Sequence, residues 1–371
     1  MTPQLHPLRI AEVRRETADA ISITFEVPPL LADVFEYEHG QYITLETELK
    51  GEKVRRAYSM SSSPVEGTLT VSVKRIKGGV MSNHLNDHAR AGETLQVMPP
   101  QGRFTLPLDA AKYRSFYFLG GGSGITPLYS IIKTVLEKEP KSSLFLLYGN
   151  YDEDSIIFKA QLEDLQRRYE GQLFVEHILS DPKQDKTGGG MFGFMKKSTS
   201  SWTGLVGVPD QKAINTWLDR NPAPTAETVF FTCGPLPMMR NLEAVVAARG
   251  IDKKQFHMEV FSSATEQKEG AAAAALVHTG ASVAAVKLNG KKFEVPIAAG
   301  QTILDSLLKA GYDAPFSCKS GACSTCIAKL NSGKVEMDAC FALNDDEVAD
   351  GYILACTARP TTAAINVDFD A

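Results

Sequence analysis

Three of the chain's six cysteines lie within the short segment CKSGACSTC, residues 318–326. Their spacing, Cys-x4-Cys-x2-Cys, restricts the fold more than any other feature, because thiols this close together must serve one common site. In a reducing compartment, clustered cysteines bind metals or take part in redox chemistry more often than they form disulfides. The segment therefore raises two questions: which metal it holds, and which distant residue completes the set.

The spacing is that of a plant-type iron-sulfur run, which needs one more cysteine far downstream. Cys340 and Cys356 are the two candidates. We expect Cys356, because the apolar run GYILACTARP can return it to the loop as a strand; Cys340 is then a spare thiol. The competing interpretation is a four-cysteine zinc site, which usually contains two CxxC pairs instead. Small residues such as Gly321 and Ala322 allow backbone N–H groups to approach cluster sulfurs.

The remaining sequence divides the 371 residues into several parts, too many for one ordinary core. Residues 1–110 alternate short apolar runs with turns, which predicts an antiparallel β-barrel. Residues 111–261 alternate strands with helices, which is typical of a doubly wound α/β fold. Residues 283–371 predict an α+β unit with a hairpin turn at Asn289-Gly290 and a helix capped by Thr302.

Two segments offer little to bury. Residues 262–282 are small and polar and predict an interdomain linker, although their five consecutive alanines also allow a short helix. Residues 181–201 are rich in Gly, Lys and Ser, which is typical of a mobile surface loop.

Charge and composition narrow the function classes. The net charge of -5 and the 22% of charged residues give no broad attraction for nucleic acid or for an anionic membrane. The N-terminal sequence lacks the pattern of a secretory signal, and no apolar run approaches the ~18 residues of a membrane span. We therefore expect a cytoplasmic protein with no nucleic-acid partner.

The first 110 residues contain a set of side chains that suits a flavin. The segment RAYS offers a cation for a pyrophosphate, an aromatic ring and a hydroxyl donor in Arg56, Tyr58 and Ser59. Shortly afterwards, glycines and a helix start in KGGVMSNHL favour a phosphate. The residues expected to bind there are Gly79, Val80, Met81 and Ser82.

Two turns in residues 111–261 follow apolar strands and suit a dinucleotide. The first is FLGGGSGITP and the second is FFTCGPLPMM, where Cys233 has the alternative interpretation of a small buried residue. The residues expected at this dinucleotide site are Gly121, Gly122, Ser123, Gly124, Thr126, Cys233, Gly234 and Pro235.

These motifs resemble two known families. Residues 283–371 resemble plant-type [2Fe-2S] ferredoxins, which implies a β-grasp fold and cluster ligation by Cys318, Cys323, Cys326 and Cys356. Residues 8–261 resemble the ferredoxin-NADP reductase superfamily, and the whole chain is similar to reductase components of bacterial multicomponent oxygenases, the phenylacetyl-CoA epoxidase reductase group among them. The resemblance also implies FAD, whereas the residues alone do not distinguish FAD from FMN.

The resemblance further implies a catalytic set at the flavin. Its members are Tyr58, Ser59, Cys233 and Glu259, and Phe261 of the segment MEVF would lie beside the flavin ring; simple core packing is the alternative for Phe261. The implied activity is NAD(P)H-dependent. FAD accepts electrons in pairs and the cluster takes them singly, for delivery to an oxygenase or another electron-acceptor protein. The alternatives are a general flavin reductase for a cytochrome or a separate ferredoxin, and a redox-sensing binding module.

Two questions stay open at this level. Asp181 stands where an arginine for the 2'-phosphate of NADPH is expected, which favours NADH, whereas lysines nearby can supply the missing charge. The lysines are Lys183, Lys186, Lys196 and Lys197. The acidic run NDDE, residues 344–347, is either a docking patch for a basic partner or a solvated turn.

Overall fold

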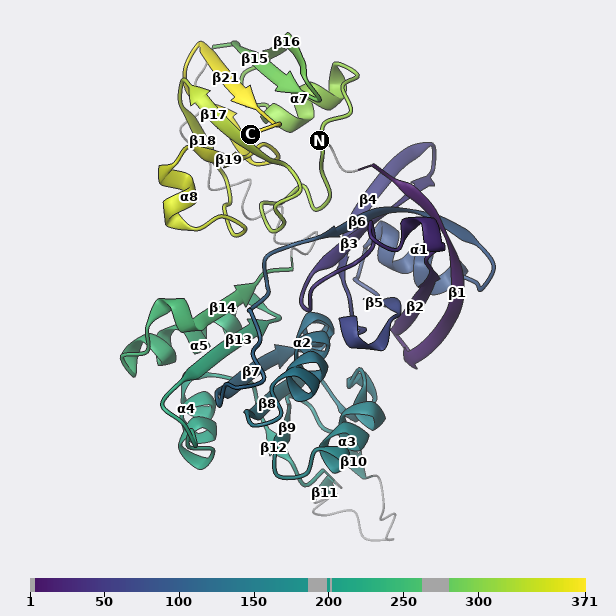
Figure 1. Ribbon diagram of the computed structural model, residues 1–371, viewed down its shortest axis with the longest axis vertical. Helices are drawn as coiled ribbons and strands as arrows, with labels where there is room; N and C mark the ends of the chain where they lie inside the picture. Colours follow the sequence, from purple (N-terminus) through teal and green to yellow (C-terminus); the bar gives the residue numbers. More distant parts are fainter. Residues whose placement is uncertain (1–3, 186–198, 201, 262–279) are drawn as a thin grey trace, which may run out of the picture.

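The structure is a computed structural model that describes residues 4–185, 199–200, 202–261 and 280–371 (Figure 1). It contains an N-terminal barrel domain, a central α/β domain and a C-terminal domain, formed by β1–β6, β7–β14 and β15–β21 respectively. Most of the predicted linker, and Lys186, Lys196 and Lys197 in the predicted loop, lie outside the described residues.

The barrel domain is a six-stranded antiparallel sheet in the order β4-β3-β6-β1-β2-β5. A bridge between Met60 and Val71 connects its two edges, and apolar side chains from all six strands fill the interior. This confirms the predicted antiparallel barrel. The elements are β1 (His6–Thr17), β2 (Ala20–Glu26), β3 (Tyr42–Leu49), β4 (Glu52–Ser59), β5 (Leu69–Lys74), α1 (Val80–His88) and β6 (Thr94–Gln101), with short 3-10 turns η1 (Pro29–Leu31) and η2 (Pro64–Glu66).

The α/β domain has an all-parallel sheet in the order β12-β9-β8-β7-β13-β14. The strand order reverses between β7 and β13, and ligands of open α/β sheets bind at the carboxyl edge of such a switch point. The predicted doubly wound fold is confirmed. The elements are β7 (Ser115–Gly121), η3 (Gly122–Gly124), α2 (Ile125–Lys138), β8 (Ser143–Asn150), η4 (Glu153–Ser155), α3 (Lys159–Arg168), β9 (Leu173–Leu179), β10 (Gln184–Asp185), β11 (Thr199–Ser200), β12 (Leu205–Val206), α4 (Gln211–Arg220), β13 (Thr228–Cys233), α5 (Leu236–Ala248), η5 (Lys253–Gln255) and β14 (Phe256–Glu259).

The C-terminal domain is a mixed sheet in the order β16-β15-β21-β17-β19, in which β15 and β21 are parallel, as in a β-grasp fold. The predicted hairpin turn is present, with positive φ at Asn289 and Gly290, and Thr302 caps the helix by accepting from the Asp305 amide at 3.2 Å. The elements are β15 (Ser282–Leu288), β16 (Lys291–Ile297), α7 (Ile303–Lys309), β17 (Ile327–Ser332), β18 (Val335–Met337), α8 (Asp345–Ala349), β19 (Tyr352–Leu354), β20 (Ala358–Pro360) and β21 (Ala364–Asp368).

The C-terminal domain packs against the barrel domain through a buried arginine of β4. Arg55 pairs with Glu46 of its own domain at 2.6 Å and with Asp313 of the C-terminal domain at 3.3 Å. Its guanidinium also lies 4.6 Å from the centre of the Phe316 ring. Arg55 is only 5% exposed, whereas Asp313 lies largely in solvent, so the contact with Phe316 orders this interface more than the ion pair does.

The acidic run NDDE contacts other parts of the same chain. Asp345 pairs with Lys253 of the α/β domain at 2.9 Å, and Glu347 pairs with Arg103, which follows the last barrel strand. The Lys253–Asp345 pair is exposed and the Arg103–Glu347 pair is partly exposed, and such surface pairs contribute little to stability. In this arrangement the run is an intramolecular contact surface.

None of the helices in the described ranges has both the length and the apolar character that crossing a membrane requires.

Candidate functional site

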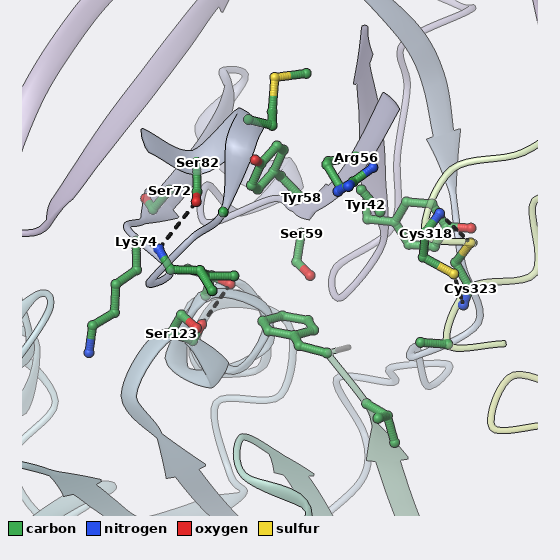
Figure 2. A pocket seen from close by; sticks show the side chains of 18 of the residues that line it. Tyr42, Arg56, Tyr58, Ser59, Ser72, Lys74, Ser82, Ser123, Cys318 and Cys323 are labelled. Carbon is green, nitrogen blue, oxygen red and sulfur yellow. Dashed lines mark hydrogen bonds between the residues drawn. The ribbon is translucent and has the colours of Figure 1, made fainter. Parts of the chain in front are cut away.

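One pocket takes wall residues from all three domains. It encompasses about 1190 Å³ of space, including its open mouth. Figure 2 shows Lys74 and the two cysteines at opposite ends of this view, with Ser59 between them. The lining residues are Tyr42, Arg56, Ala57, Tyr58, Ser59, Ser72, Lys74, Ile76, Gly78, Gly79, Val80, Met81, Ser82, Ser123, Thr126, Glu259, Val260, Phe261, Cys318, Ala322 and Cys323.

Strand β4 delivers three predicted flavin residues to this pocket. Side chains alternate along a strand, so Arg56 lines the pocket while Arg55 before it lies in the interface with the C-terminal domain. Arg56 donates to the Arg55 carbonyl at 2.7 Å, which restrains its position. Burial raises the pKa of Tyr58, so its phenol is neutral. Ser59, at the end of the strand, is buried and lines the same wall.

The start of α1 forms a second wall. A side chain at Gly79 would approach Ser82 Oγ to 2.6 Å and the Ile76 carbonyl to 3.1 Å, so the turn leaves no room for one. Ser82 Oγ accepts from the Ile76 amide at 3.2 Å and holds the turn closed (Figure 2). The first amides of the helix thus lie at the pocket, where a phosphate is favoured. Met81 packs its side chain into the barrel core, so only its backbone suits a ligand.

The two glycine turns of the α/β domain pack backbone against backbone at the switch point. A side chain at Gly124 would lie 2.0 Å from the Cys233 carbonyl oxygen, and one at Gly234 would lie 2.8 Å from the Gly121 amide nitrogen. Of the predicted nicotinamide residues, Ser123 and Thr126 line the pocket. Gly121, Gly122, Gly124, Cys233, Gly234 and Pro235 do not line it.

Cys233 lies behind the pocket wall. It is fully buried in the core of the α/β domain, as the alternative interpretation of a small buried residue predicts. Strand pairing places it next to Glu259 in the neighbouring strand. Burial is the main cause that raises its pKa well above the usual range, so the thiol is protonated.

Glu259 and Phe261, at the end of the α/β domain, reach the same pocket. The Glu259 carboxylate accepts a hydrogen bond from Ser59 Oγ at 3.1 Å, which connects two domains across the site. Burial raises the pKa of Glu259 from 4.5 to about 8, against the smaller opposing effect of that hydrogen bond. The carboxyl is therefore neutral at pH 7. Phe261 both lines the pocket and packs against the adjacent core, so its two predicted roles coexist.

The structure brings Cys356 to the cysteine loop. Contact with the thiols of Cys323 and Cys356 lowers the pKa of Cys318, and Cys356 also contacts Cys326. Backbone amides of Ser320 and Cys323 donate to Cys318 Sγ at 3.4 and 3.3 Å, the type of contact that stabilises a thiolate. These contacts bring all four predicted ligands together.

Cys340 is not among these contacts: it is half-buried, and burial is the main cause that raises its pKa. Within the described ranges, no three Cys, His, Asp or Glu side chains are grouped as around a single metal ion. The contacts between the four thiols run from Cys323 through Cys318 and Cys356 to Cys326.

The chain around the cysteine loop is tightly packed. Gly321 has a φ of +74°, and a side chain there would lie 2.5 Å from the Ala339 carbonyl oxygen. The amides of Phe341 and Ala342 both donate to the Gly321 carbonyl, at 3.0 and 3.1 Å. The loop can therefore close around a cluster only with glycine at this position.

Sequence reasoning missed two prominent pocket residues, Tyr42 and Lys74. Both lie at strand ends, Tyr42 at the start of β3 and Lys74 at the end of β5. Lys74 approaches Gly122: a side chain added at Gly122 would lie 3.6 Å from Lys74 Nζ. A lone tyrosine or lysine in a strand carries no motif, and only strand pairing could have indicated that Tyr42 adjoins Ser59.

The residues present fit the expected groups. A basic side chain, an open helix start and a buried hydroxyl surround the pocket, and these are the groups that a flavin nucleotide needs. Four thiols with backbone donors suit an iron-sulfur cluster.

Comparison with known protein families matches each domain separately. Residues 7–106 match an oxidoreductase FAD-binding domain and residues 118–244 match an oxidoreductase NAD-binding domain. Residues 286–361 match a 2Fe-2S iron-sulfur cluster binding domain. The predicted cofactors, FAD, a nicotinamide coenzyme and a [2Fe-2S] cluster, are thereby confirmed, and zinc is not the metal of the site.

Relatives with known activities are similar over nearly the whole chain. One of the subunits of the 1,2-phenylacetyl-CoA epoxidase of Escherichia coli is 35% identical over 370 residues, which cover 99% of this chain and 98% of that protein. The ferredoxin reductase component of the 3-ketosteroid-9-alpha-monooxygenase of Mycobacterium tuberculosis is 36% identical, covering 98% of this chain and 95% of that protein. Phthalate dioxygenase reductase has the same fold over 98% of both chains, with a TM-score of 0.59 and 22% identity.

Proposed function

We propose a specific activity from one premise: the chain belongs to the family of oxygenase reductase components that combine FAD-binding, NAD-binding and [2Fe-2S] domains. Members of this family are oxidoreductases that pass electrons to oxygenase components. We propose that this chain oxidises NADH and reduces an oxygenase similar to the phenylacetyl-CoA epoxidase. The shared pocket is the observation that supports this best, since a flavin in it would adjoin Ser123 on one side and Cys318 on the other.

When bound, FAD accepts electrons in pairs and releases them singly. The residues of this chain bind and orient it. Arg56, the amides of residues 80–82 and Lys74 supply positive charge for phosphates. Tyr58 offers a flat ring, and Ser59 offers a hydroxyl held in place by Glu259. Cys318, Cys323, Cys326 and Cys356 are the proposed cluster ligands.

Nicotinamide binding involves two groups of residues. Ser123 and Thr126 contact the coenzyme directly, because they line the pocket. The glycines and Cys233 act indirectly, because their packing shapes the two turns. Phe261 lines the same pocket and would offer its ring to the flavin.

The preference for NADH rests on charge at the ends of β8 and β9. Residues 151–154 and 180–183 contain four carboxylates and one lysine. Lys183 pairs with Asp154, and Asp181 accepts from the Tyr151 hydroxyl at 2.5 Å. A 2'-phosphate dianion at this edge would meet a surplus of negative charge, which disfavours NADPH.

The activity is tested by anaerobic titration of the purified protein. We expect complete reduction with about 1.5 NADH per chain, since FAD takes two electrons and a [2Fe-2S] cluster takes one. NADPH should be poorer by at least about tenfold in kcat/KM. Continuous turnover with ferricyanide and with a purified oxygenase component should follow. Reduction that stops once the protein's own centres are filled would instead indicate a sensor.

A pH dependence follows from Glu259. Because its pKa is raised above the usual value, the carboxyl is neutral below about pH 8 and ionises above it. A carboxylate beside the flavin site repels the negative charge that a hydride brings, so the rate of flavin reduction should fall about tenfold from pH 7 to pH 9. The free energy of unfolding should change in the same direction. The contribution of Glu259 to it is fully present below pH 4.5 and is lost as the pH rises through about 8, because the buried carboxyl must then ionise.

The Glu259→Gln variant provides the matched control. Glutamine is permanently neutral and still accepts from Ser59, so its reduction rate should match the original protein at pH 7 and should stay level to pH 9. Stopped-flow flavin reduction across this range gives the comparison. The same alkaline decline in both proteins would show that another group titrates.

A further inference from the structure

Tyr42 lies where the barrel wall of the pocket meets the cysteine loop. Its side chain lines the pocket and packs in one cluster with Cys318 and Cys323, and only 5% of it is exposed. In the barrel sheet Tyr42 pairs with Ser59, so the two side chains lie on one face of the sheet. In Figure 2, Tyr42 lies between Arg56 and the two cysteines. Among the described barrel residues, only Ala57 joins Tyr42 at that cluster, where it packs at the edge.

A hydrogen-bond chain joins Tyr42 to the middle of the cysteine loop. Its hydroxyl lies 3.0 Å from Thr325 Oγ1, and Thr325 Oγ1 donates to Gln101 Oε1 at 3.0 Å. A threonine hydroxyl has one proton, so Tyr42 must be the donor to Thr325. Thr325 lies between two proposed ligands, Cys323 and Cys326. The chain therefore fastens the loop to strands β3 and β6 of the barrel.

The Tyr42 ring is itself held in place. Gly102 has a φ of +115°, and a side chain there would lie 3.0 and 3.1 Å from two ring carbons of Tyr42. The ring occupies a slot that only glycine leaves open. The barrel therefore restricts where the ring can lie, and the hydroxyl meets Thr325 from that position.

We propose that Tyr42 is a positioning residue that holds the cysteine loop against the flavin pocket and so sets the distance for internal electron transfer. This rests on the proposed function. Tyr42 undergoes no redox or covalent change; one electron leaves the flavin site, and one ferric iron of the cluster becomes ferrous. Displacing reacting groups by about 1 Å can slow a positioned reaction by about 100-fold, so loss of the anchor is expected to be measurable.

The test removes the hydroxyl of either partner in the Tyr42–Thr325 hydrogen bond. Tyr42→Phe and Thr325→Val should each slow cluster reduction in a stopped-flow single turnover by about 3- to 10-fold, the range of one lost hydrogen bond. Hydrogen exchange of the amides in residues 318–326 should become faster in both variants. The double variant should be no slower than Thr325→Val alone, because that substitution already removes the bond to Tyr42 together with the bond to Gln101. In Thr325→Val, reduction of ferricyanide by NADH should be unchanged, since that acceptor takes electrons from the flavin and Thr325 does not line the pocket.

Matched controls remove comparable hydroxyls away from the interface. Tyr37 bonds to Ser62 within the barrel, and Thr24 bonds to Thr70, so Tyr37→Phe and Thr24→Val should leave both readouts unchanged. Unaltered transfer and exchange in Tyr42→Phe and Thr325→Val would overturn the proposal. If Tyr42→Phe loses flavin, Thr325→Val still tests it from the C-terminal domain. Absence of flavin or iron in the original protein would reject the proposed function instead.

Discussion

Replacing Cys356 with serine should remove the iron-sulfur cluster and leave the flavin in place. Cys356 contacts two of the other proposed ligands, and the flavin pocket has its binding residues in the barrel and α/β domains. Electron delivery to an oxygenase should fall by more than about 100-fold, because changes to groups around a metal centre already cost 10- to 100-fold. Iron and sulfide analysis measures loss of the cluster. The visible spectrum shows whether the flavin remains, and ferricyanide turnover shows whether that flavin is still reduced.

Cys340→Ser is the control for this experiment. Cys340 is half-buried and does not contact the four thiols, so this variant should keep its iron and its oxygenase-linked rate. If Cys340→Ser lost the cluster and Cys356→Ser kept it, the assignment of the fourth ligand would be wrong. Near-normal ferricyanide turnover in Cys356→Ser would also show that the flavin works without the cluster.

Replacing Arg56 with alanine should weaken FAD retention by about 10- to 100-fold, the equivalent of one hydrogen bond to a charged group. Arg56 lines the pocket and is restrained by its bond to the Arg55 carbonyl. Flavin content after dialysis and fluorescence titration of the apoprotein with FAD and FMN give the measurement. Loss of affinity for both flavins should be similar if the contact is to the phosphate nearest the ring, and larger for FAD if it is to the second phosphate.

Arg75→Ala is the matched control for Arg56. Arg75 follows β5, pairs with Asp87 at 2.6 Å and does not line the pocket. The Arg75→Ala substitution removes the same charge from the same domain. Comparing it with Arg56→Ala therefore separates a specific phosphate contact from general electrostatic attraction. Arg56→Lys should be intermediate, because an ammonium keeps the charge and loses the planar fork. Equal weakening in all three variants would reject the phosphate contact.

The parts of the site that depend on short sequence motifs could be predicted from the sequence. The cysteine spacing, the RAYS segment and the glycine turns depend on short-range geometry, and the structure places Cys356, Ser59 and Ser123 in the surroundings that these motifs indicate. Strand and helix periodicity was equally informative: Leu128 and Ile131, three residues apart on one face of α2, are both buried. Such patterns reflect backbone conformation and burial, which neighbouring residues largely determine.

Contacts between domains were not predictable from local patterns. Cys233 suited a coenzyme contact by its motif, yet neighbouring strands bury it completely. The acidic run NDDE suited a partner, yet Asp345 and Glu347 pair with Lys253 and Arg103 of the same chain. Each depends on residues far apart in the sequence, whose proximity is a result of packing.

Residue types and their spacing were enough to predict the chemistry of this protein, because cofactors are recognised by short sets of residue types: four thiols for a di-iron cluster, and a cation, a ring and a hydroxyl for a flavin. How those sets combine depends on the tertiary structure. It placed Tyr42 beside Ser59 on one side and against Cys318 and Cys323 on the other, and it raised the pKa of Glu259 by burying it. Distances between redox sites and the solvation of a carboxyl depend on three packed domains at once, and no single segment of the chain encodes them.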